Sequence, residues 1–185
     1  MRVAVFCSSS DRIDPGFVAT AEDLGRRLAE RGHELVWGGG RSGLMGAVAR
    51  AAQAAGGRVI GVIPESMMEV EVAYTDADEL LVVPDMRTRK HEMDVRADAF
   101  LVLPGGFGTL EELSEILVGR VLAHHMRPVV LLDDRGFYGP LLSLFDHFVQ
   151  QGFASPGHLT HLQVVSTLDR ALEAVESGAS SPHAG

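Results

Sequence analysis

The sequence predicts an α/β fold with a doubly wound, mainly parallel sheet covered by helices on both faces. Short apolar runs alternate with longer amphipathic segments along the chain, which is the pattern of strands and their crossover helices. Several apolar runs are continuous rather than alternating, as is typical of parallel strands buried on both faces. The chain has 185 residues, of which 46% are hydrophobic and 22% are charged, enough for one domain with a sizeable core.

The N-terminal third of the chain predicts a βαβαβ unit. Asp14 and Pro15 are suited to the N-cap and the first position of a helix, and the glycine-dense turn 38–43 opens a second helix. The elements expected here are a strand over 2–7, a helix from 15 to 32, a strand over 34–37, a helix over 44–56 and a strand over 58–63. Residues 65–78 predict a loop with one helical turn at most.

The rest of the chain repeats this alternation and completes a Rossmann-like domain. The expected elements are a strand over 79–83, a helix over 85–97, strands over 99–103 and 128–133, helices over about 110–124 and 140–151, a strand over 163–166 and a helix over 168–177. We expect a single domain over residues 1–177 and a disordered tail over 178–185.

The charge of the chain argues against two classes of partner. Its net charge of −9 disfavours an electrostatic grip on nucleic acid or on an anionic membrane. No apolar run approaches the ~18 residues of a membrane span, and the N-terminus enters a strand without a signal-peptide pattern. We therefore expect a cytoplasmic protein that binds neither nucleic acid nor membrane.

Cysteine, lysine and histidine usage narrows the chemistry further. Cys7 is the only cysteine, which excludes an internal disulfide and a cysteine-rich metal site. Lys90 is the only lysine, so any chemistry that needs a lysine has one candidate. The adjacent histidines 124 and 125 would point apart on the predicted helix, so they would not bind one metal ion together. The histidines 158 and 161 lie in a predicted loop far in sequence from the glycine motifs. We expect no metal site.

The first glycine loop, residues 38–43, matches the pattern GxGxxG between a strand and a helix. A dinucleotide site also needs an acidic residue at the end of the next strand, and Glu65 lies just beyond that position. In the alternative interpretation, the glycines form a tight turn and allow the helix to pack closely on the sheet. The sequence leaves both interpretations open.

The second glycine loop, residues 104–109, precedes a helix that carries Glu111 and Glu112 in its first turn as predicted. Small residues let backbone N–H groups approach an anion, and the helix N-terminus adds a favourable dipole, so a phosphate fits here. No Lys-Ser or Lys-Thr follows the glycines, which argues against NTP hydrolysis. Two carboxylates beside a phosphate should face another group, such as a sugar.

Two structural interpretations would explain the carboxylate Glu112 and the basic residues of the helix over 85–97 without a role in binding or catalysis. Thr109 and Glu112 have the spacing of a capping box, in which Thr109 caps the helix and Glu112 reaches back to its backbone. The helix over 85–97 carries a mixture of charges that is typical of a solvated face, with the basic residues Arg87, Arg89, Lys90 and Arg96. That helix nevertheless begins at the carboxyl end of a strand next to the glycine loop.

Three stretches of the chain resemble one known family, at residues 86–93, 97–100 and 104–112. This is the Lonely Guy (LOG) family of cytokinin riboside 5′-monophosphate phosphoribohydrolases, and the match to its signature PGGxGTxxE is complete. The earlier glycines 38–46 are similar to its second glycine motif, and the resemblance extends over roughly residues 2–150. It implies hydrolysis of the N-glycosidic bond of an adenine-type nucleotide, which releases the free base and ribose 5-phosphate without a cofactor.

The resemblance also implies roles for individual residues. Arg89 and Glu112 would be the catalytic pair, and the substrate would be contacted by Glu71, Lys90, Gly105, Gly106, Phe107, Gly108, Thr109, Leu110 and Glu111. A carboxylate suits a reaction that develops oxocarbenium character at the anomeric carbon, by analogy with O-glycosidases. Arg89 suits the task of keeping Glu112 ionised and holding phosphate or ribose oxygens.

Two further function classes and an assembly are considered. A pyridoxal phosphate-dependent lysine decarboxylase would need Lys90 as its Schiff-base residue, and a non-catalytic carrier would bind a nucleotide or the molybdenum cofactor without turnover. A homodimer, or an assembly of dimers, is expected because the helix over 110–124 has more apolar positions than one sheet-facing stripe needs, namely Leu113, Ile116, Leu117, Val121 and Leu122. The resemblance implies the same.

Overall fold

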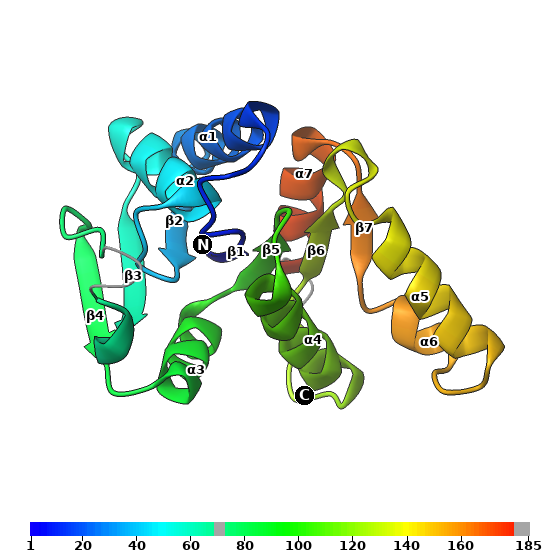
Figure 1. Cartoon of the computed structure of the whole chain (residues 1–185). Helices are drawn as coiled ribbons and strands as arrows, with labels where there is room; N and C mark the ends of the chain where they lie inside the picture. The colour runs from blue at the N-terminus through cyan, green and yellow to red at the C-terminus, as the bar shows by residue number, and fades with distance from the viewer. Residues whose placement is uncertain (69–72, 180–185) are drawn as a thin grey trace.

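The computed structural model describes residues 1–68 and 73–179, and these residues form a seven-stranded sheet. Every neighbouring pair of strands is parallel, and the strand order is β4-β3-β2-β1-β5-β6-β7 (Figure 1). The strands are β1 (Arg2–Phe6), β2 (Glu34–Trp37), β3 (Val59–Pro64), β4 (Glu79–Val83), β5 (Ala99–Val102), β6 (Val129–Leu132) and β7 (Gln163–Val165). The predicted α/β fold with a parallel sheet is confirmed.

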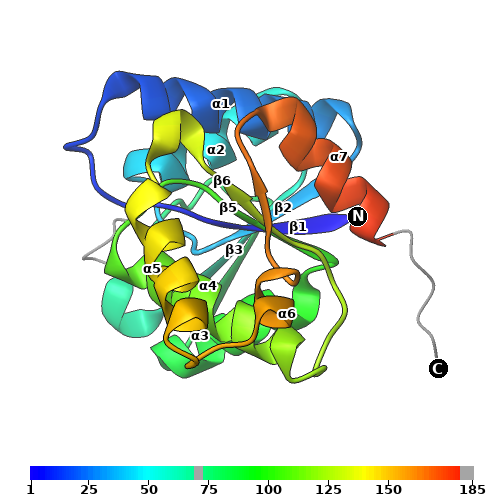
Figure 2. The ribbon, with the colours of Figure 1, turned by 90° about the vertical axis from the view of Figure 1, so that its right-hand side faces the viewer.

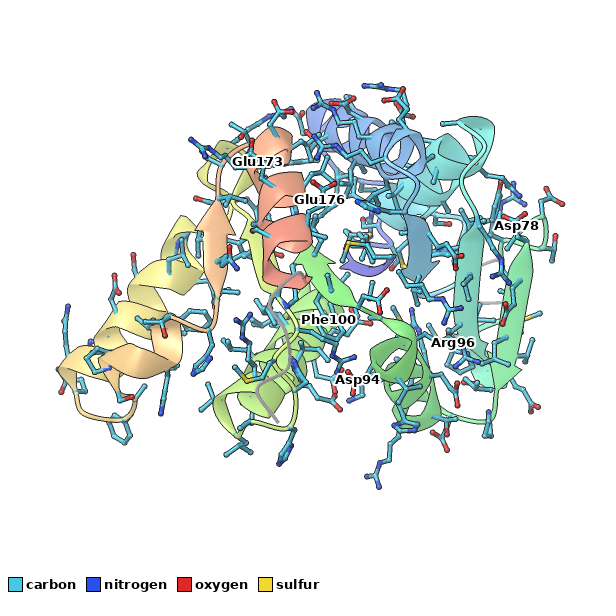
Figure 3. All side chains as sticks on the ribbon, turned by 180° about the vertical axis from the view of Figure 1, so that it is seen from behind. Asp78, Asp94, Arg96, Phe100, Glu173 and Glu176 are labelled. Carbon is cyan, nitrogen blue, oxygen red and sulfur yellow. The ribbon has the colours of Figure 1, made fainter. Side chains whose placement is uncertain are left out.

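Helices cover both faces of this sheet. They are α1 (Pro15–Glu30), α2 (Gly43–Ala54), α3 (Met86–Arg96), α4 (Phe107–Val121), α5 (Gly139–Gln150), α6 (Pro156–Leu159) and α7 (Leu168–Ala179), with short 3₁₀ turns η1 (Glu65–Met67) and η2 (Asp134–Gly136). Figure 2 shows α1, α2 and α7 on one side of the sheet and α3, α4 and α5 on the other. Figure 3 shows the same division from behind, with Glu173 and Glu176 on α7 and Asp94 and Arg96 on α3.

Alternating side chains of the strands build a core on each face. Val3 and Val5 of β1 pack under α1, α2 and α7, whereas Ala4 and Phe6 pack on the side of α3, α4 and α5. Because side chains alternate along a strand, one apolar run supplies both cores. This explains why the strands are continuous apolar runs in the sequence.

The first two helices show how local sequence sets the packing. The Asp14 carboxylate accepts a hydrogen bond from the Gly16 N–H at 2.8 Å and caps α1, with Pro15 at its first position. At Gly25, a Cβ atom would lie 2.2 Å from the Val48 carbonyl oxygen of α2. Only glycine therefore allows the two helices to approach this closely.

The strand order reverses between β1 and β5. The chain adds β2, β3 and β4 on one side of β1, then returns to place β5 on its other side, with Phe6 opposite Val102. The loops that follow these two strands diverge at the carboxyl edge of the sheet and are linked by a hydrogen bond from the Ser8 N–H to the Pro104 carbonyl at 3.2 Å. In doubly wound folds, ligands bind at such a reversal.

Most predicted bounds differ from the structure by one or two residues, and α4 differs by three residues at each end. It begins at Phe107 rather than near residue 110 and ends at Val121 rather than 124, because Gly106 takes the N-cap and the weak helix formers after it join the first turn. Helix α7 continues to Ala179, so residues 178 and 179 are helical rather than part of the expected tail, and residues 180–185 lie outside the described residues. At Gly178 a Cβ atom would lie 2.6 Å from Pro128 Cβ, which places this last turn against the chain before β6.

Candidate functional site

Two cavities are lined by predicted site residues. A cavity of about 290 Å³ at the carboxyl edge of the sheet is lined by residues of the loops after β1, β5 and β6, including Ser8, Gly105 and Gly106. A second cavity of about 410 Å³ lies between α3 and α4, is lined by Lys90 and Glu112 among others, and extends to the chain before β6. The predicted residues Gly105 and Gly106 therefore line one cavity, and Lys90 and Glu112 line the other.

Arg89 is a buried side chain on α3, with only 5% of its surface exposed. Asp85 caps this helix by accepting from the Thr88 N–H at 2.7 Å, and Arg89 follows in the first turn. Its guanidinium Nη2 donates to the Gly38 carbonyl oxygen at 3.2 Å. A Cβ atom at Gly38 would lie 1.8 Å from the same nitrogen, so a glycine at this position makes room for the arginine.

The solvated-face interpretation of α3 is therefore wrong for Arg89. It holds for Arg87, which is exposed, and Arg96 pairs with Glu92 of its own helix. The difference follows from position, because Arg89 lies on the side of α3 that faces the end of β2, as its bond to Gly38 shows.

The charges of Glu112 and Arg89 both affect the pKa of the thiol of Cys7, the residue after β1. Burial raises the pKa of the Cys7 thiol, the negative charge of Glu112 raises this pKa further, and the positive charge of Arg89 lowers it. Both charged groups therefore lie within electrostatic reach of the same buried sulfur. Residues from α3 and α4, far apart in the sequence, are brought to one place beside β1.

The capping-box interpretation of Glu112 is wrong. The N-cap of α4 is Gly106, which makes no side-chain capping bond, so Thr109 lies inside the first turn and Glu112 lies in the second. Thr109 is buried, and its hydroxyl lies against Gly105, where a Cβ atom would be 2.1 Å from Oγ1. The capping pattern misleads because the helix starts before the residue that resembles its cap.

The start of α4 has the features of an anion site. The first turn of a helix has N–H groups without intrahelical partners, and here no side chain caps them. Gly106 and Gly108 are exposed, and Phe107 between them is 92% exposed. A phosphate can therefore reach the backbone of this turn, where the helix dipole also favours negative charge.

Lys90 bridges α3 and α4. Its Nζ lies 2.5 Å from Glu111 Oε1 and 2.6 Å from Glu115 Oε2, and the hydrogen bonds that it donates to these carboxylates raise the pKa of the ammonium group. A Schiff-base lysine needs a neutral amine. The surroundings of the only lysine therefore do not fit a pyridoxal phosphate enzyme.

The backbone N–H groups at the start of α2, directly after the first glycine loop, already donate hydrogen bonds to other groups of the protein. The Gly43 N–H donates to Asp11 Oδ1 at 2.7 Å, and the Leu44 and Met45 N–H groups donate to the Ser8 carbonyl at 2.9 and 3.3 Å. Gly43 has φ +57°, and a Cβ atom there would lie 2.6 Å from the Ser9 carbonyl carbon. The tight-turn interpretation is favoured over a dinucleotide site, because a pyrophosphate would have to displace these bonds.

Sequence reasoning missed two residues of this region. The pKa of the buried Cys7 thiol is shifted by the charges of both Arg89 and Glu112, and the Tyr138 hydroxyl donates to the Leu103 carbonyl at 2.7 Å, just before the second glycine loop. The signal that could have found Tyr138 is its place after β6, because the carboxyl ends of neighbouring parallel strands share one edge. The predicted substrate residue Glu71 lies outside the described residues.

The described residues contain neither a group of metal-ligating side chains nor a helix that could span a membrane. Across residues 1–68 and 73–179, no three or more His, Cys, Asp and Glu side chains are grouped as metal ligands. Over the same ranges, no helix combines the length and the apolar character that a membrane crossing requires.

Comparisons with known proteins point to one family. The family model described as "Possible lysine decarboxylase" matches residues 45–175. The probable cytokinin riboside 5′-monophosphate phosphoribohydrolase LOG4 of Oryza sativa subsp. japonica is 48% identical over 151 residues, which cover 82% of this chain and 66% of that protein. LOG7 of Arabidopsis thaliana, a cytokinin riboside 5′-monophosphate phosphoribohydrolase, is 46% identical over 84% of this chain and 71% of its own length. The chain thus spans about two thirds of these relatives.

Solved structures share the fold. The molybdenum cofactor carrier protein of Chlamydomonas reinhardtii has a TM-score of 0.74 at 22% identity and covers 97% of this chain and 98% of its own. The molybdenum cofactor binding protein of Rippkaea orientalis has a TM-score of 0.72 at 24% identity, with 95% of each chain covered. At these identities the likeness concerns the fold alone.

Proposed function

Because the chain belongs to the LOG family, with curated relatives 41 to 48% identical to it, we propose that it is a nucleoside 5′-monophosphate phosphoribohydrolase. It hydrolyses the N-glycosidic bond of an adenine-type nucleotide, such as a cytokinin riboside 5′-monophosphate or AMP, to the free base and ribose 5-phosphate. The observation that carries this proposal is the uncapped N-terminus of α4 within the family signature at residues 104–112. Arg89, the other residue of the proposed catalytic pair, is buried against the Gly38 carbonyl oxygen.

Glu112 acts on the sugar. Cleavage of the bond between base and ribose develops positive charge at the anomeric carbon, and a carboxylate nearby stabilises that charge. The same carboxylate orients or deprotonates the attacking water, as in the glycosidases. The arrangement supports this role because Glu112 lies in the second turn of α4, which directly follows the glycine loop that would hold the phosphate, and because it lines the cavity between α3 and α4.

Arg89 keeps that carboxylate ionised and positions the substrate. A buried guanidinium close to a carboxylate favours its charged form, and Arg89 is held in place by the Gly38 carbonyl at 3.2 Å. The planar guanidinium also suits ribose or phosphate oxygens. Its burial among protein groups means that little reorganisation is needed when the substrate binds.

The backbone from Gly105 to Thr109 binds the 5′-phosphate, with Leu110 and Glu111 continuing the contact surface. Lys90 contributes positive charge next to this surface while it pairs with Glu111 and Glu115. Glu71, carried over from the family motif, is proposed as a further substrate contact. No metal and no cofactor are required by this scheme, because backbone N–H groups and Arg89 supply the electrostatic stabilisation.

We also propose that the active form is a homodimer or an assembly of dimers. Apolar side chains on and after α4 are exposed, including Val118 at 53%, Leu122 at 59% and Met126 at 58%, which is unfavourable in an isolated chain. Within the described residues, the buried Nε and Nη1 atoms of Arg120, on the same helix, have no hydrogen-bond partner. A second copy of the chain would cover the apolar atoms and offer acceptors to Arg120. A cytoplasmic location stays a prediction from the sequence.

Base release tests the proposed function. The purified protein is incubated with AMP and, separately, with isopentenyladenosine monophosphate, and free base and ribose 5-phosphate are measured by chromatography. We expect equal amounts of the two products, and none from the variant Glu112→Gln over the same time. Binding of the nucleotides without base release would favour a non-catalytic carrier and would overturn the proposal.

A further inference from the structure

Tyr138 is a buried polar side chain in an apolar core. Only 5% of its surface is exposed, and it belongs to the cluster that includes Phe6, Phe100 and Leu131. Its ring packs edge-on against Phe137, with 4.9 Å between the ring centroids. A buried hydroxyl needs hydrogen-bond partners, and those of Tyr138 belong to the glycine loop.

The phenol oxygen of Tyr138 lies at the start of the second glycine loop. Its hydroxyl donates to the Leu103 carbonyl at 2.7 Å, and the Gly105 N–H faces the same oxygen. The proline between them has no N–H of its own, and its carbonyl accepts from the Ser8 N–H at 3.2 Å. The two successive peptide groups before the phosphate-binding turn, Leu103–Pro104 and Pro104–Gly105, are thus held by groups from neighbouring loops.

Tyr138 is itself fixed in position. Its backbone N–H donates to Asp133 Oδ1 at 2.7 Å, and Asp133 follows directly after β6, where its N–H donates to the Val165 carbonyl of β7 at 2.8 Å. Burial raises the pKa of the phenol well above its ordinary value, so the hydroxyl stays protonated and remains a donor to Leu103. A rigid part of the sheet therefore determines where Gly105 lies.

We propose that Tyr138 is a positioning residue for the phosphate-binding loop. Its hydroxyl fixes the peptide groups of Leu103 and Gly105, so that the N–H groups of the first turn of α4 face the 5′-phosphate before the substrate arrives. This inference rests on the proposed function and deepens it, because it assigns recognition of the phosphate to a residue that does not touch the substrate. Preorganised donors bind an anion more tightly than donors that must first be ordered.

The variant Tyr138→Phe tests this role, because it removes one oxygen and keeps the packed ring. We expect the dissociation constant for AMP and for ribose 5-phosphate to rise about tenfold, the usual scale for one lost positioning hydrogen bond. Adenosine, which has no phosphate, should bind as it does to the wild type. In steady-state kinetics with AMP, KM should rise about tenfold while kcat changes less than threefold.

Tyr74→Phe is the matched control. Tyr74 is the other tyrosine of the chain. Its hydroxyl also donates a hydrogen bond, to Gln53 Oε1 of α2 at 2.7 Å rather than to the second glycine loop. This variant should bind AMP and adenosine like the wild type. All binding is measured at a temperature at which circular dichroism shows each variant fully folded.

Hydrogen exchange supplies a second measurement. In Tyr138→Phe, the amides of residue 103 and residues 105–109 should exchange faster than in the wild type, while those of α1 and α2 should not change. Unchanged AMP binding, or an equal loss for AMP and adenosine, would overturn the role of Tyr138. Failure of the proposed function looks different, because then the wild type itself releases no base from any nucleotide.

Discussion

Replacing Glu112 by glutamine removes the charge of the proposed catalytic carboxylate and preserves its size. Because α4 begins at Phe107, Glu112 lies in the second turn and takes no part in capping, so no capping bond is lost. Glutamate and glutamine have similar helix propensities, and the amide oxygen can still accept a hydrogen bond. We therefore expect the free energy of unfolding to change by less than about 1 kcal/mol.

Catalysis should suffer far more than stability. An amide neither accepts a proton nor offsets a developing positive charge, and the loss of a general base typically lowers the rate about 10²–10⁴-fold. This corresponds to about 3 to 5 kcal/mol in the activation barrier. The change in barrier is thus several times the expected change in stability, which separates a chemical role from a structural one.

The assay compares base release from AMP with denaturant unfolding, for wild type, Glu112→Gln and Glu173→Gln. The control residue Glu173 lies on α7, on the opposite face of the sheet (Figure 3), and pairs with Arg170 of the same helix at 3.3 Å. Its variant should match the wild type in both measurements. Near-normal base release by a folded Glu112→Gln would refute the mechanism, because no other residue here is proposed for that step.

Three further predictions follow from named contacts. Gly38→Ala places a Cβ atom where Arg89 Nη2 lies, at 1.8 Å, so base release should fall at least about tenfold and stability by about 1–3 kcal/mol in denaturant unfolding. The hydrogen bond with His33 lowers the pKa of Glu176, so this carboxylate stabilises the fold above its unfolded-state pKa and loses that effect as the pH falls through the lowered value. Glu176→Gln should therefore cost less than about 1 kcal/mol at pH 7 and nothing once the pH has fallen below the lowered pKa, as a pH series of unfolding curves would show. Leu122→Arg places a charge at the exposed residue that directly follows α4 and should give a monomer in light scattering, whereas an unchanged mass would contradict the proposed interface.

Sequence reasoning was most successful where hydrophobic periodicity decides the structure. The runs 34–37 and 79–83 are strands with the predicted bounds, because a buried strand tolerates little else. The predicted start of α4 was wrong because Gly106 precedes the helix without a capping side chain, whereas Thr109 and Glu112 have the sequence spacing of a capping box. Periodicity carries no information on such a start, and only the backbone conformation determines it.

The candidate site was predicted in part, and the rest depended on tertiary contacts. The motifs indicated Arg89 and Glu112, but nothing local indicated that Arg89 is buried against Gly38 or that both charges act on the Cys7 thiol. The contact of Tyr138 with the chain before the second glycine loop was not predicted, because its partner, Leu103, is distant in the sequence. Residues that act through another residue have no spacing rule of their own, so they become visible only when the strands are placed side by side.

The reversal of strand order between β1 and β5 has a consequence for how activity is acquired. Arg89 and its partner Gly38 come from the half of the chain that builds β1 to β4, whereas Glu112 and Tyr138 come from the half that builds β5 to β7. Neither half contains a complete site. The two halves join where β1 pairs with β5, where α1 lies against α7 and where Lys90 bridges α3 and α4. During refolding, catalytic activity should therefore be regained after helical structure, as the signal that the two halves have docked.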